Sequence, residues 1–223
     1  MDGLQLAVFD WDGTLLDNCL SSFGRSSQIC SHFGLPMPTL EEYRNEIGSD
    51  FFGFYQRRGL PPSVTREDLY ALWPTTSSTH VPTLHDGVPE LLTFLRSIGL
   101  SIAIVSAESH DALEEHLEQF GLSFAVDFVR GSAWDKTEGL IEALKYAGVA
   151  AEEACYVDDT FDGITAAKDV GLITIGFAGG YNTRERIMEA EPDFPSPGSP
   201  NINTLAAVRD IIRELSRNTV RIT

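Results

Sequence analysis

Five short apolar runs, separated by stretches with helical periodicity, constrain the fold of this chain more than any other feature of its sequence. The runs cover residues 4–9, 101–106, 126–129, 154–157 and 173–177. They are rich in Val, Ile, Ala and Phe without polar alternation, which is typical of strands covered on both faces. Apolar side chains recur at helical spacing over residues 89–98, 109–120, 137–147 and 162–170. Strand and helix in turn predict an α/β fold with a doubly wound parallel sheet.

A long segment without a convincing strand interrupts this alternation. Within it, a capping box at Thr39 opens one predicted helix, and residues 64–73 form another. We therefore expect an inserted α-helical cap over residues 18–84. The α/β core then consists of residues 1–17 and 85–223.

The charge balance limits the partners of the chain. It contains 33 acidic residues against 16 Lys and Arg, a formal net charge of −17. Such a surface repels phosphate backbones and anionic lipids, so we expect no nucleic-acid and no membrane partner. The first residues lack the basic region of a signal peptide, and the three cysteines form no CxxC pair. We expect a cytoplasmic protein with reduced thiols, either a monomer or a homodimer.

The first predicted strand ends in two acidic residues, within the segment Asp10-Trp11-Asp12-Gly13-Thr14. Ligands of doubly wound sheets bind outside the carboxyl ends of the strands. Alternation places Asp10 and Asp12 on the same side of the extended chain, and Gly13 allows a sharp turn after them. Two acids on one side can divide a reaction between a nucleophile and a general acid/base.

Polar residues also follow the next three predicted strands. Ser106 ends the second, and Lys136 lies between the third and its following helix. Asp158 and Asp159 end the fourth. Singly, each has an ordinary explanation as a turn residue or a solvated charge. Adjacent acids aimed at a site that already holds two carboxylates repel each other unless a divalent cation or a proton intervenes.

Taken in order, these residues resemble the four motifs of the haloacid dehalogenase superfamily, in its phosphoglycolate-phosphatase-like branch of phosphatases with a helical cap. The matching segments are AVFDWDGTLLD, VSA, Lys136 and YVDDTFDGITAAKDVG. The resemblance covers residues 4–177 and implies a Rossmann-like core. It also implies Mg²⁺-dependent hydrolysis of a small-molecule phosphate monoester, so that the partner is a small phosphorylated metabolite.

The resemblance also implies a role for each matching residue in phosphate transfer. Asp10 would be the nucleophile that forms an aspartyl-phosphate. Asp12 would protonate the leaving oxygen and then activate the hydrolytic water. Ser106 and Lys136 would hold the phosphoryl oxygens, with Lys136 also shielding Asp10. These roles fit phosphoryl transfer, in which positioning and charge neutralisation dominate catalysis.

The implied metal site combines side-chain and backbone oxygens. Mg²⁺ would bind the Asp10 carboxylate, the backbone carbonyl of Asp12 and Asp159, with Asp158 a direct or water-mediated ligand. Another common form of the fourth motif carries an Asp where this chain has Gly163. We do not transfer that metal role to the adjacent Asp162, which we expect to cap the following helix.

The identity of the substrate depends on the predicted cap. Its polar candidates are a loop at residues 45–48 and the arginines Arg25, Arg44, Arg57 and Arg58. An arginine facing the site would suit a carboxylate or a second phosphate. This favours a phosphoglycolate-like acid or a phosphosugar.

Other activities remain to be distinguished. Asp12 argues against a dehalogenase, which has no leaving alkoxide to protonate. A phosphorylated receiver domain has its acidic pair before the phosphorylated Asp, the hydroxyl and the Lys. Here the acidic pair comes last, which argues against that class. A phosphomutase of the same superfamily, β-phosphoglucomutase-like, would keep all four motifs. From a different class, a catalytically silent phosphate-binding protein could share the fold.

Overall fold

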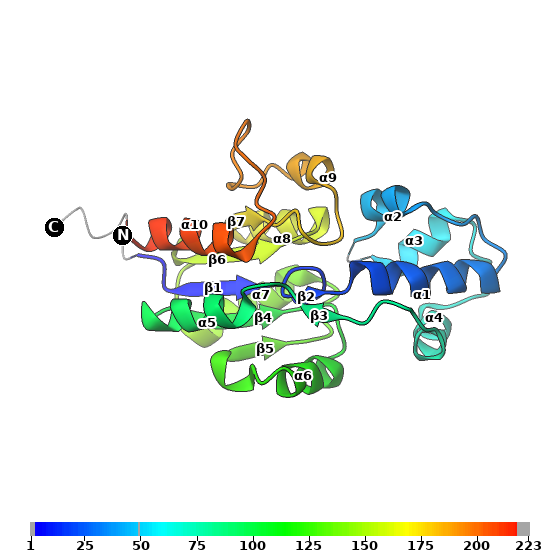
Figure 1. Cartoon of the computed structure of the whole chain (residues 1–223), viewed down its shortest axis with the longest axis horizontal. Coiled ribbons are helices and arrows are strands. Elements are labelled where there is room, and N and C mark those ends of the chain that lie inside the picture. Colours follow the sequence, from blue (N-terminus) through cyan, green and yellow to red (C-terminus); the bar gives the residue numbers. More distant parts are fainter. Residues whose placement is uncertain (1–2, 49, 218–223) are drawn as a thin grey trace.

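A five-stranded parallel sheet forms the centre of the protein, and its computed structural model describes residues 3–48 and 50–217. The strand order is β5-β4-β1-β6-β7 (Figure 1). The strands are β1 (Leu6–Phe9), β4 (Ser101–Val105), β5 (Phe128–Arg130), β6 (Ala154–Asp158) and β7 (Ile173–Gly176). All five apolar runs are therefore strands, which confirms the predicted sheet. The third strand begins two residues later than predicted, because a short 3-10 helix, Ser123–Ala125, and an extended residue precede it.

Helices cover both faces of this sheet. They are α5 (Val88–Ser97), α6 (His110–Gln119), α7 (Lys136–Ala147), α8 (Phe161–Val170), α9 (Arg184–Glu189) and α10 (Leu205–Arg217), with a 3-10 turn at Ala151–Glu153. Phe9 of β1 packs in one buried cluster with α5, α6 and α10. Val8 packs in a second with α7 and α8. Neighbouring strand residues thus enter opposite hydrophobic layers, as the doubly wound class requires.

A helical segment lies between the first strand and the second strand of the sheet. It contains α1 (Cys19–His32), α2 (Leu40–Glu46), α3 (Phe51–Arg57), α4 (Arg66–Leu72) and a 3-10 turn at Trp73–Thr75. Its side chains form a third cluster, which includes Ile29, Tyr43, Phe54 and Leu69. Two of these helices were predicted, whereas α1 and α3 were not. The helices extend to one side of the sheet in Figure 1.

The two ends of this segment run past each other. They carry β2 (Leu16–Asp17) and β3 (Thr83–Leu84), which pair antiparallel. The expectation that residues 18–84 contain no strand is therefore wrong for two residues. These residues pair because the hydrogen bonds between the two chain segments satisfy backbone N–H and C=O groups where the segments enter and leave the helical part. The division into core and cap at these points stays a prediction.

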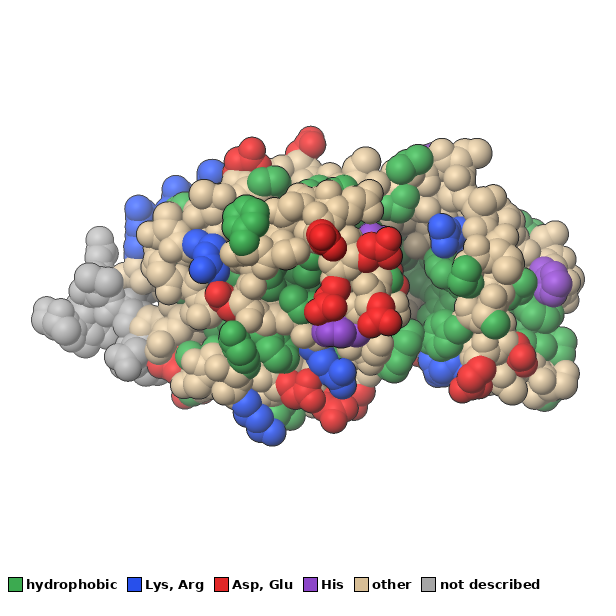
Figure 2. Space-filling model, turned by 90° about the horizontal axis from the view of Figure 1, so that it is seen from below, with side chains coloured by type: hydrophobic (Ala, Val, Ile, Leu, Met, Phe, Trp, Pro, Cys, Tyr) green, Lys and Arg blue, Asp and Glu red, His purple; other side chains and the backbone are tan. Residues whose placement is uncertain are grey.

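The described surface agrees with the composition. Acidic side chains gather in the middle of the face seen in Figure 2, in keeping with the excess of 33 acidic over 16 basic residues. Cys19, Cys30 and Cys155 are buried free thiols, as expected. Among the helices of residues 3–48 and 50–217, none has the length and apolarity that a membrane crossing requires.

Sheet register brings three strand ends together. Phe9 pairs with Ile104 of β4 on one side and with Val157 of β6 on the other. β1 ends at Phe9, and β4 and β6 each continue for one more residue, so the carboxyl ends of the three strands lie together along one edge of the sheet. This is the edge at which a doubly wound sheet binds ligands.

Candidate active site

A buried ion pair lies at this edge. Lys136, the first residue of α7, places its Nζ against Asp10 Oδ1 and donates a hydrogen bond of 2.9 Å to the Val105 carbonyl. Both side chains are less than 10% exposed. The helix directs Lys136 inward because Asp135 caps it, accepting a hydrogen bond of 2.9 Å from the Thr137 N–H. From the sequence alone, Lys136 could equally have been an ordinary solvated lysine. In the structure it is buried in the site, against Asp10.

The charges of this pair depend on each other. Burial raises the pKa of Asp10 to about 7, the Lys136 ammonium opposes this rise, and the Asp158 charge adds to it. Burial acts to lower the pKa of Lys136, but the charges of Asp10 and Asp158 outweigh it and raise that pKa. Lys136 is therefore a permanent cation beside a carboxyl that ionises near neutrality.

Three carboxylates meet beside Lys136. Asp10, Asp158 and Asp159 each offer an oxygen, and these oxygens lie within 4.8 Å of one another. Burial, followed by the charges of Asp158 and Asp10, raises the pKa of Asp159 well above its usual range. A set of oxygen donors whose mutual repulsion needs a counter-charge fits Mg²⁺. The structure thus brings together the residues that the sequence predicted from separate strand ends.

Side chains outside the predicted set hold Asp158 in place. The Tyr156 hydroxyl donates a hydrogen bond of 2.6 Å to Asp158 Oδ2. The Thr160 N–H and hydroxyl each donate at 2.7 Å to Asp158 Oδ1. Sequence reasoning missed Tyr156, although its position two residues before Asp158 on one strand puts both on the same face.

Asp159 is held by two further segments. The Thr14 hydroxyl donates to Asp159 Oδ1 at 2.8 Å, and the Tyr181 N–H donates to Asp159 Oδ2 at 2.5 Å. Thr14 lies within the first motif, so its spacing could have revealed it. Tyr181 follows the pair Gly179-Gly180 after β7. This pair is typical of a turn, and it is the one local signal in the sequence that points to a special backbone position there.

Two glycines are required by the close approach of backbone to Asp159. Gly13 has a φ of +85°, and a Cβ there would lie 2.2 Å from Asp159 Oδ2. A Cβ at Gly180 would lie 2.1 Å from the same oxygen. Any side chain at either position would displace the carboxylate.

The start of α8 corrects one expectation. Asp162 does not cap this helix; Thr160 does, because its side chain accepts a hydrogen bond of 3.1 Å from the Gly163 N–H. Asp162 lies in the first turn instead. A Cβ at Gly163 would lie 2.0 Å from Asp158 Oδ2. A side chain at position 163 would therefore have to displace the Asp158 carboxylate.

The Asp12 carboxylate is not one of the three grouped carboxylates. Its Oδ1 accepts a hydrogen bond of 2.6 Å from the Asn18 side chain. Burial, followed by the charges of Glu108 and Asp10, raises its pKa well above the usual range. A carboxyl with a raised pKa holds its proton more readily and can donate it to a leaving oxygen.

Ser106 occupies the end of β4, one residue beyond the carbonyl that Lys136 contacts. It is fully buried, and its backbone N–H donates at 2.9 Å to the Arg130 carbonyl. Its hydroxyl oxygen accepts a hydrogen bond of 3.1 Å from the Glu108 N–H. The hydroxyl keeps its own proton to donate, as a phosphoryl-binding group must.

The loop after β7 connects the site to the helical segment. The Asn182 side chain donates at 2.8 Å to the carbonyls of Arg44 and Ile47. Arg44 in turn donates at 2.9 Å to the Tyr181 carbonyl, and the hydroxyls of Tyr181 and Ser22 are 2.6 Å apart. The prediction of a loop at residues 45–48 is wrong for Asn45 and Glu46, which belong to α2. The end of this helix, with Ile47 after it, packs against the core next to the backbone that holds Asp159.

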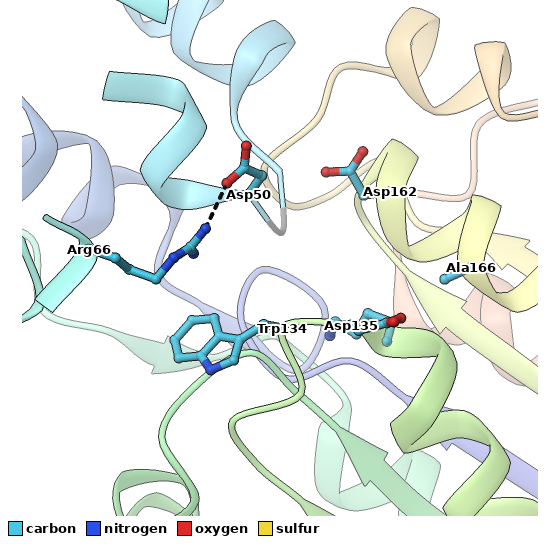
Figure 3. A pocket seen from close by; sticks show the side chains of 7 residues that line it. Asp50, Arg66, Trp134, Asp135, Asp162 and Ala166 are labelled. Carbon is cyan, nitrogen blue, oxygen red and sulfur yellow. Dashed lines mark hydrogen bonds and ion pairs between the residues drawn. The ribbon is translucent and has the colours of Figure 1, made fainter. Parts of the chain in front are cut away.

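A cavity of about 540 Å³ opens between this helical segment and the amino ends of α7 and α8 (Figure 3). Its lining residues are Asp50, Arg66, Trp134, Asp135, Lys136, Asp162 and Ala166. Of the buried ion pair, Lys136 lines this cavity, and Asp10 does not. A substrate whose phosphate lies beside Lys136 would extend its remaining atoms into this space.

The four arginines proposed from sequence do not line the cavity. Arg25 lies over the Trp73 ring at 5.4 Å, and Arg44 contacts the loop after β7. Arg57 and Arg58 both donate to Glu46, at 3.0 and 2.8 Å. Arg66 lines the cavity instead. Arg66 was not among the predicted residues, because its neighbours in the sequence do not indicate that the start of α4 lies at the cavity.

Comparisons with known proteins agree with this geometry. The family model described as haloacid dehalogenase-like hydrolase matches residues 7–177, which confirms the resemblance and the prediction of a hydrolase. Phosphoglycolate phosphatase from Vibrio parahaemolyticus is 29% identical over 222 residues, covering 92% of this chain and 97% of the relative. Tyrosine-protein kinase PtkA from Mycobacterium tuberculosis is 25% identical over 218 residues, covering 94% and 72%. Relatives of similar identity thus have different activities.

A solved structure shares the fold. It is that of a predicted phosphatase from Clostridium acetobutylicum, which superimposes with a TM-score of 0.77. The two sequences are 19% identical, and the match covers 96% of this chain and 100% of the other. At this identity the comparison supports the α/β architecture, and the activity has to be argued from the site.

Proposed function

Since the chain belongs to the haloacid dehalogenase-like hydrolases, we propose that it is a Mg²⁺-dependent phosphatase that hydrolyses a small-molecule phosphate monoester. One observation carries the proposal: the buried Lys136 ammonium lies against Asp10, beside the carboxylates of Asp158 and Asp159. The arrangement supplies a nucleophile, a fixed cation and an oxygen-lined metal position within one edge of the sheet. Its relatives include phosphatases, which agrees with this chemistry.

In the first step, the Asp10 carboxylate attacks phosphorus and an aspartyl-phosphate forms as the bond to the leaving oxygen breaks. Lys136 and the Ser106 hydroxyl stabilise negative charge on the phosphoryl oxygens. Asp12 gives its proton to the leaving oxygen, so that a neutral alcohol departs. The raised pKa of Asp12 supports this role, because the carboxyl must be protonated at the start.

In the second step, the ionised Asp12 takes a proton from water as the water oxygen attacks phosphorus. The bond between phosphorus and Asp10 breaks, inorganic phosphate leaves, and both carboxyls return to their initial states. One residue acts first as acid and then as base, so the cycle needs no further proton donor. The hydrogen bond from Asn18 supports this by orienting the carboxylate.

We assign the metal position to Asp10, Asp158 and Asp159, with the Asp12 backbone carbonyl as a fourth oxygen donor. A bound Mg²⁺ supplies positive charge against the transferring phosphoryl group. The residues around it prepare the site: Tyr156 and Thr160 orient Asp158, while Thr14 and Tyr181 orient Asp159. Such outer contacts fix the ligands before the ion arrives.

A substrate panel tests the proposal. The protein is assayed for phosphate release from metabolite phosphates, including phosphoglycolate and phosphosugars, with Mg²⁺ and with EDTA. We expect release that requires Mg²⁺. A phosphomutase would instead transfer label from a sugar phosphate to a second sugar hydroxyl with little release. Binding of phosphate without turnover on any compound, acetyl phosphate included, would identify a silent phosphate-binding protein and overturn the proposal.

A further inference from the structure

The cavity beside Lys136 differs in charge from a carboxylate-binding site. Three of its lining residues are acidic, namely Asp50, Asp135 and Asp162. Among the described residues, the cations that line it are Lys136, which is paired with Asp10, and Arg66. Once Lys136 serves the phosphoryl group, the rest of the lining has more negative than positive side chains. A second anionic group on the substrate would enter a repulsive field.

Arg66 is engaged by neighbours of its own. Its Nη2 lies 3.4 Å from Asp50 Oδ1, and its Nη1 donates to the Tyr70 hydroxyl at 3.4 Å. The guanidinium also lies over the Phe52 ring, 5.3 Å from the centroid. Figure 3 shows Arg66 directed toward Asp50, with both side chains among the residues that line the cavity. A substrate carboxylate would therefore have to displace Asp50 before it could pair with this arginine.

An aromatic surface lies next to these polar groups. Trp134 lines the cavity and is 42% exposed. Its ring centroid lies 4.9 Å from that of Tyr70, so that α4 of the helical segment supports it. An exposed indole beside one carboxylate and one guanidinium offers a flat apolar face, an acceptor and a donor together. That combination suits a group with a C–H face and several hydroxyls.

We propose that the alcohol part of the substrate is an uncharged polyol, so that the substrate is a monosaccharide phosphate rather than a phosphorylated carboxylic acid. This inference rests on the phosphatase function proposed above and names its substrate class. The sugar ring packs on Trp134. Its hydroxyls donate to Asp50, whose side chain is 55% exposed, and accept from Arg66. The cavity of about 540 Å³ admits a sugar, whereas a two-carbon acid would leave most of it filled by water.

Kinetics with four kinds of substrate test this selection. We compare kcat/KM for hexose and pentose phosphates, phosphoglycolate, phosphocholine and acetyl phosphate. The sugar phosphates should exceed phosphoglycolate and phosphocholine by about tenfold or more, a ratio typical of pocket discrimination. A preference for phosphoglycolate would show that the cavity selects a carboxylate, and a preference for phosphocholine would show that it selects a cation. Each of these results would overturn the inference. Either result would leave the phosphatase proposal standing.

Two variants identify the residues that select the substrate. Trp134→Ala should lower the ratio of kcat/KM for sugar phosphate to that for acetyl phosphate by about tenfold, and Trp134→Phe should restore most of it. Phe124→Ala is the matched control, because Phe124 is 83% exposed and lies outside the cavity lining. An unchanged ratio in Trp134→Ala would refute the stacking role.

Asp50→Asn tests the charge argument directly. Asn keeps the cap of α3, where Asp50 accepts a hydrogen bond of 3.0 Å from the Gly53 N–H. The substitution removes one negative charge and releases Arg66, so kcat/KM for phosphoglycolate should rise roughly fivefold relative to sugar phosphate. A ratio that does not move would contradict the assignment of Asp50 as the excluding charge.

A binding measurement keeps the inference testable without turnover. The chain has three tryptophans, and Trp134 is the one that lines the cavity. Titration with glucose 6-phosphate should change the tryptophan fluorescence of the wild-type chain and not that of Trp134→Phe. If no compound is hydrolysed but this change occurs, the phosphatase proposal fails and the polyol site stands. If neither occurs, both fail.

Discussion

Tyr156 and Asp158 lie on the same face of β6, and the buried Tyr156 hydroxyl donates a hydrogen bond of 2.6 Å to Asp158 Oδ2. Burial, followed by the charges of Asp158 and Asp10, raises the pKa of Tyr156 well above its usual range. The phenol therefore keeps its proton and always acts as a donor. This contact orients one of the three carboxylates that we assign to the metal position.

Removing this donor should weaken metal binding more than it weakens the fold. Tyr156→Phe keeps the ring and deletes one hydrogen bond to a carboxylate that the backbone also holds. We expect the Mg²⁺ concentration for half-maximal activity to rise about tenfold, as found when outer contacts of metal ligands are lost. Tyr146→Phe is the control, because Tyr146 is 60% exposed. An unaltered Mg²⁺ dependence in Tyr156→Phe would show that Asp158 needs no such orientation.

The Asp10 nucleophile predicts a loss of turnover without a loss of folding. Asp10→Asn preserves the shape of the side chain but removes the attacking charge. We expect kcat to fall by about 10³-fold or more, since no other group can form the covalent intermediate. The folded state is checked by circular dichroism, with Asp111→Asn on the exposed side of α6 as a control. Activity near that of the wild type would disprove the nucleophile assignment.

The acid/base role of Asp12 predicts a different kinetic defect. Asp12→Asn can neither protonate the leaving oxygen nor activate water, so both steps should slow by about 10²- to 10⁴-fold. With a substrate whose leaving group needs no proton, the first step should recover and the phosphoenzyme should accumulate. Acid-quenched samples incubated with ³²P-labelled acetyl phosphate would reveal it as protein-bound label. Equal rates in Asp12→Asn and wild type would remove this residue from the mechanism.

The metal-free protein should lose stability as the pH rises. Burial, the first cause, raises the pKa of Asp10 from its ordinary value of 3.8 to about 7 in the folded state. An acid with a raised pKa binds more protons when folded, so its stabilising contribution is complete below the unfolded pKa and is lost through the folded pKa. The relevant window runs from about pH 4 to about pH 7.

Thermal unfolding in EDTA between pH 5 and pH 8 measures this effect. We expect Tm to fall by roughly 5 °C or more across the range. Added Mg²⁺ should restore most of the loss at the upper end, because the ion replaces the protons. Asp10→Asn lacks this titration and should show a flatter curve. A wild-type Tm that is independent of pH, or that rises with pH, would contradict the coupling.

Sequence patterns located the strands and the acids because both signals are local. A short, mostly apolar run that is followed by Asp10 predicts a strand end from neighbouring residues alone, and the same holds for the run before Asp158. The helices α1 and α3 escaped prediction for the opposite reason. Each contains a glycine in a segment with weak helix propensity, Gly24 and Gly53, and each is stabilised by packing in the third cluster.

The start of α8 shows how a local signal can be misplaced. Thr160 and Asp162 are both residue types that cap helices, so composition alone does not choose between them. The structure decides, because β6 ends at Asp158 and α8 begins at Phe161, which makes Thr160 the N-cap.

By itself, the sequence determined the five strands of the sheet, the helices that alternate with them and the chemistry of the residues at the strand ends, because period and spacing act over a few neighbouring positions. Tertiary structure decided which distant groups meet: Tyr181 at Asp159, Arg66 against Asp50, and Trp134 at the mouth of the cavity. These contacts join residues far apart in the chain. The first lies within the core and the second within the helical segment, while the cavity lies between the two. Each forms only when packing offsets the conformational entropy of bringing distant residues together.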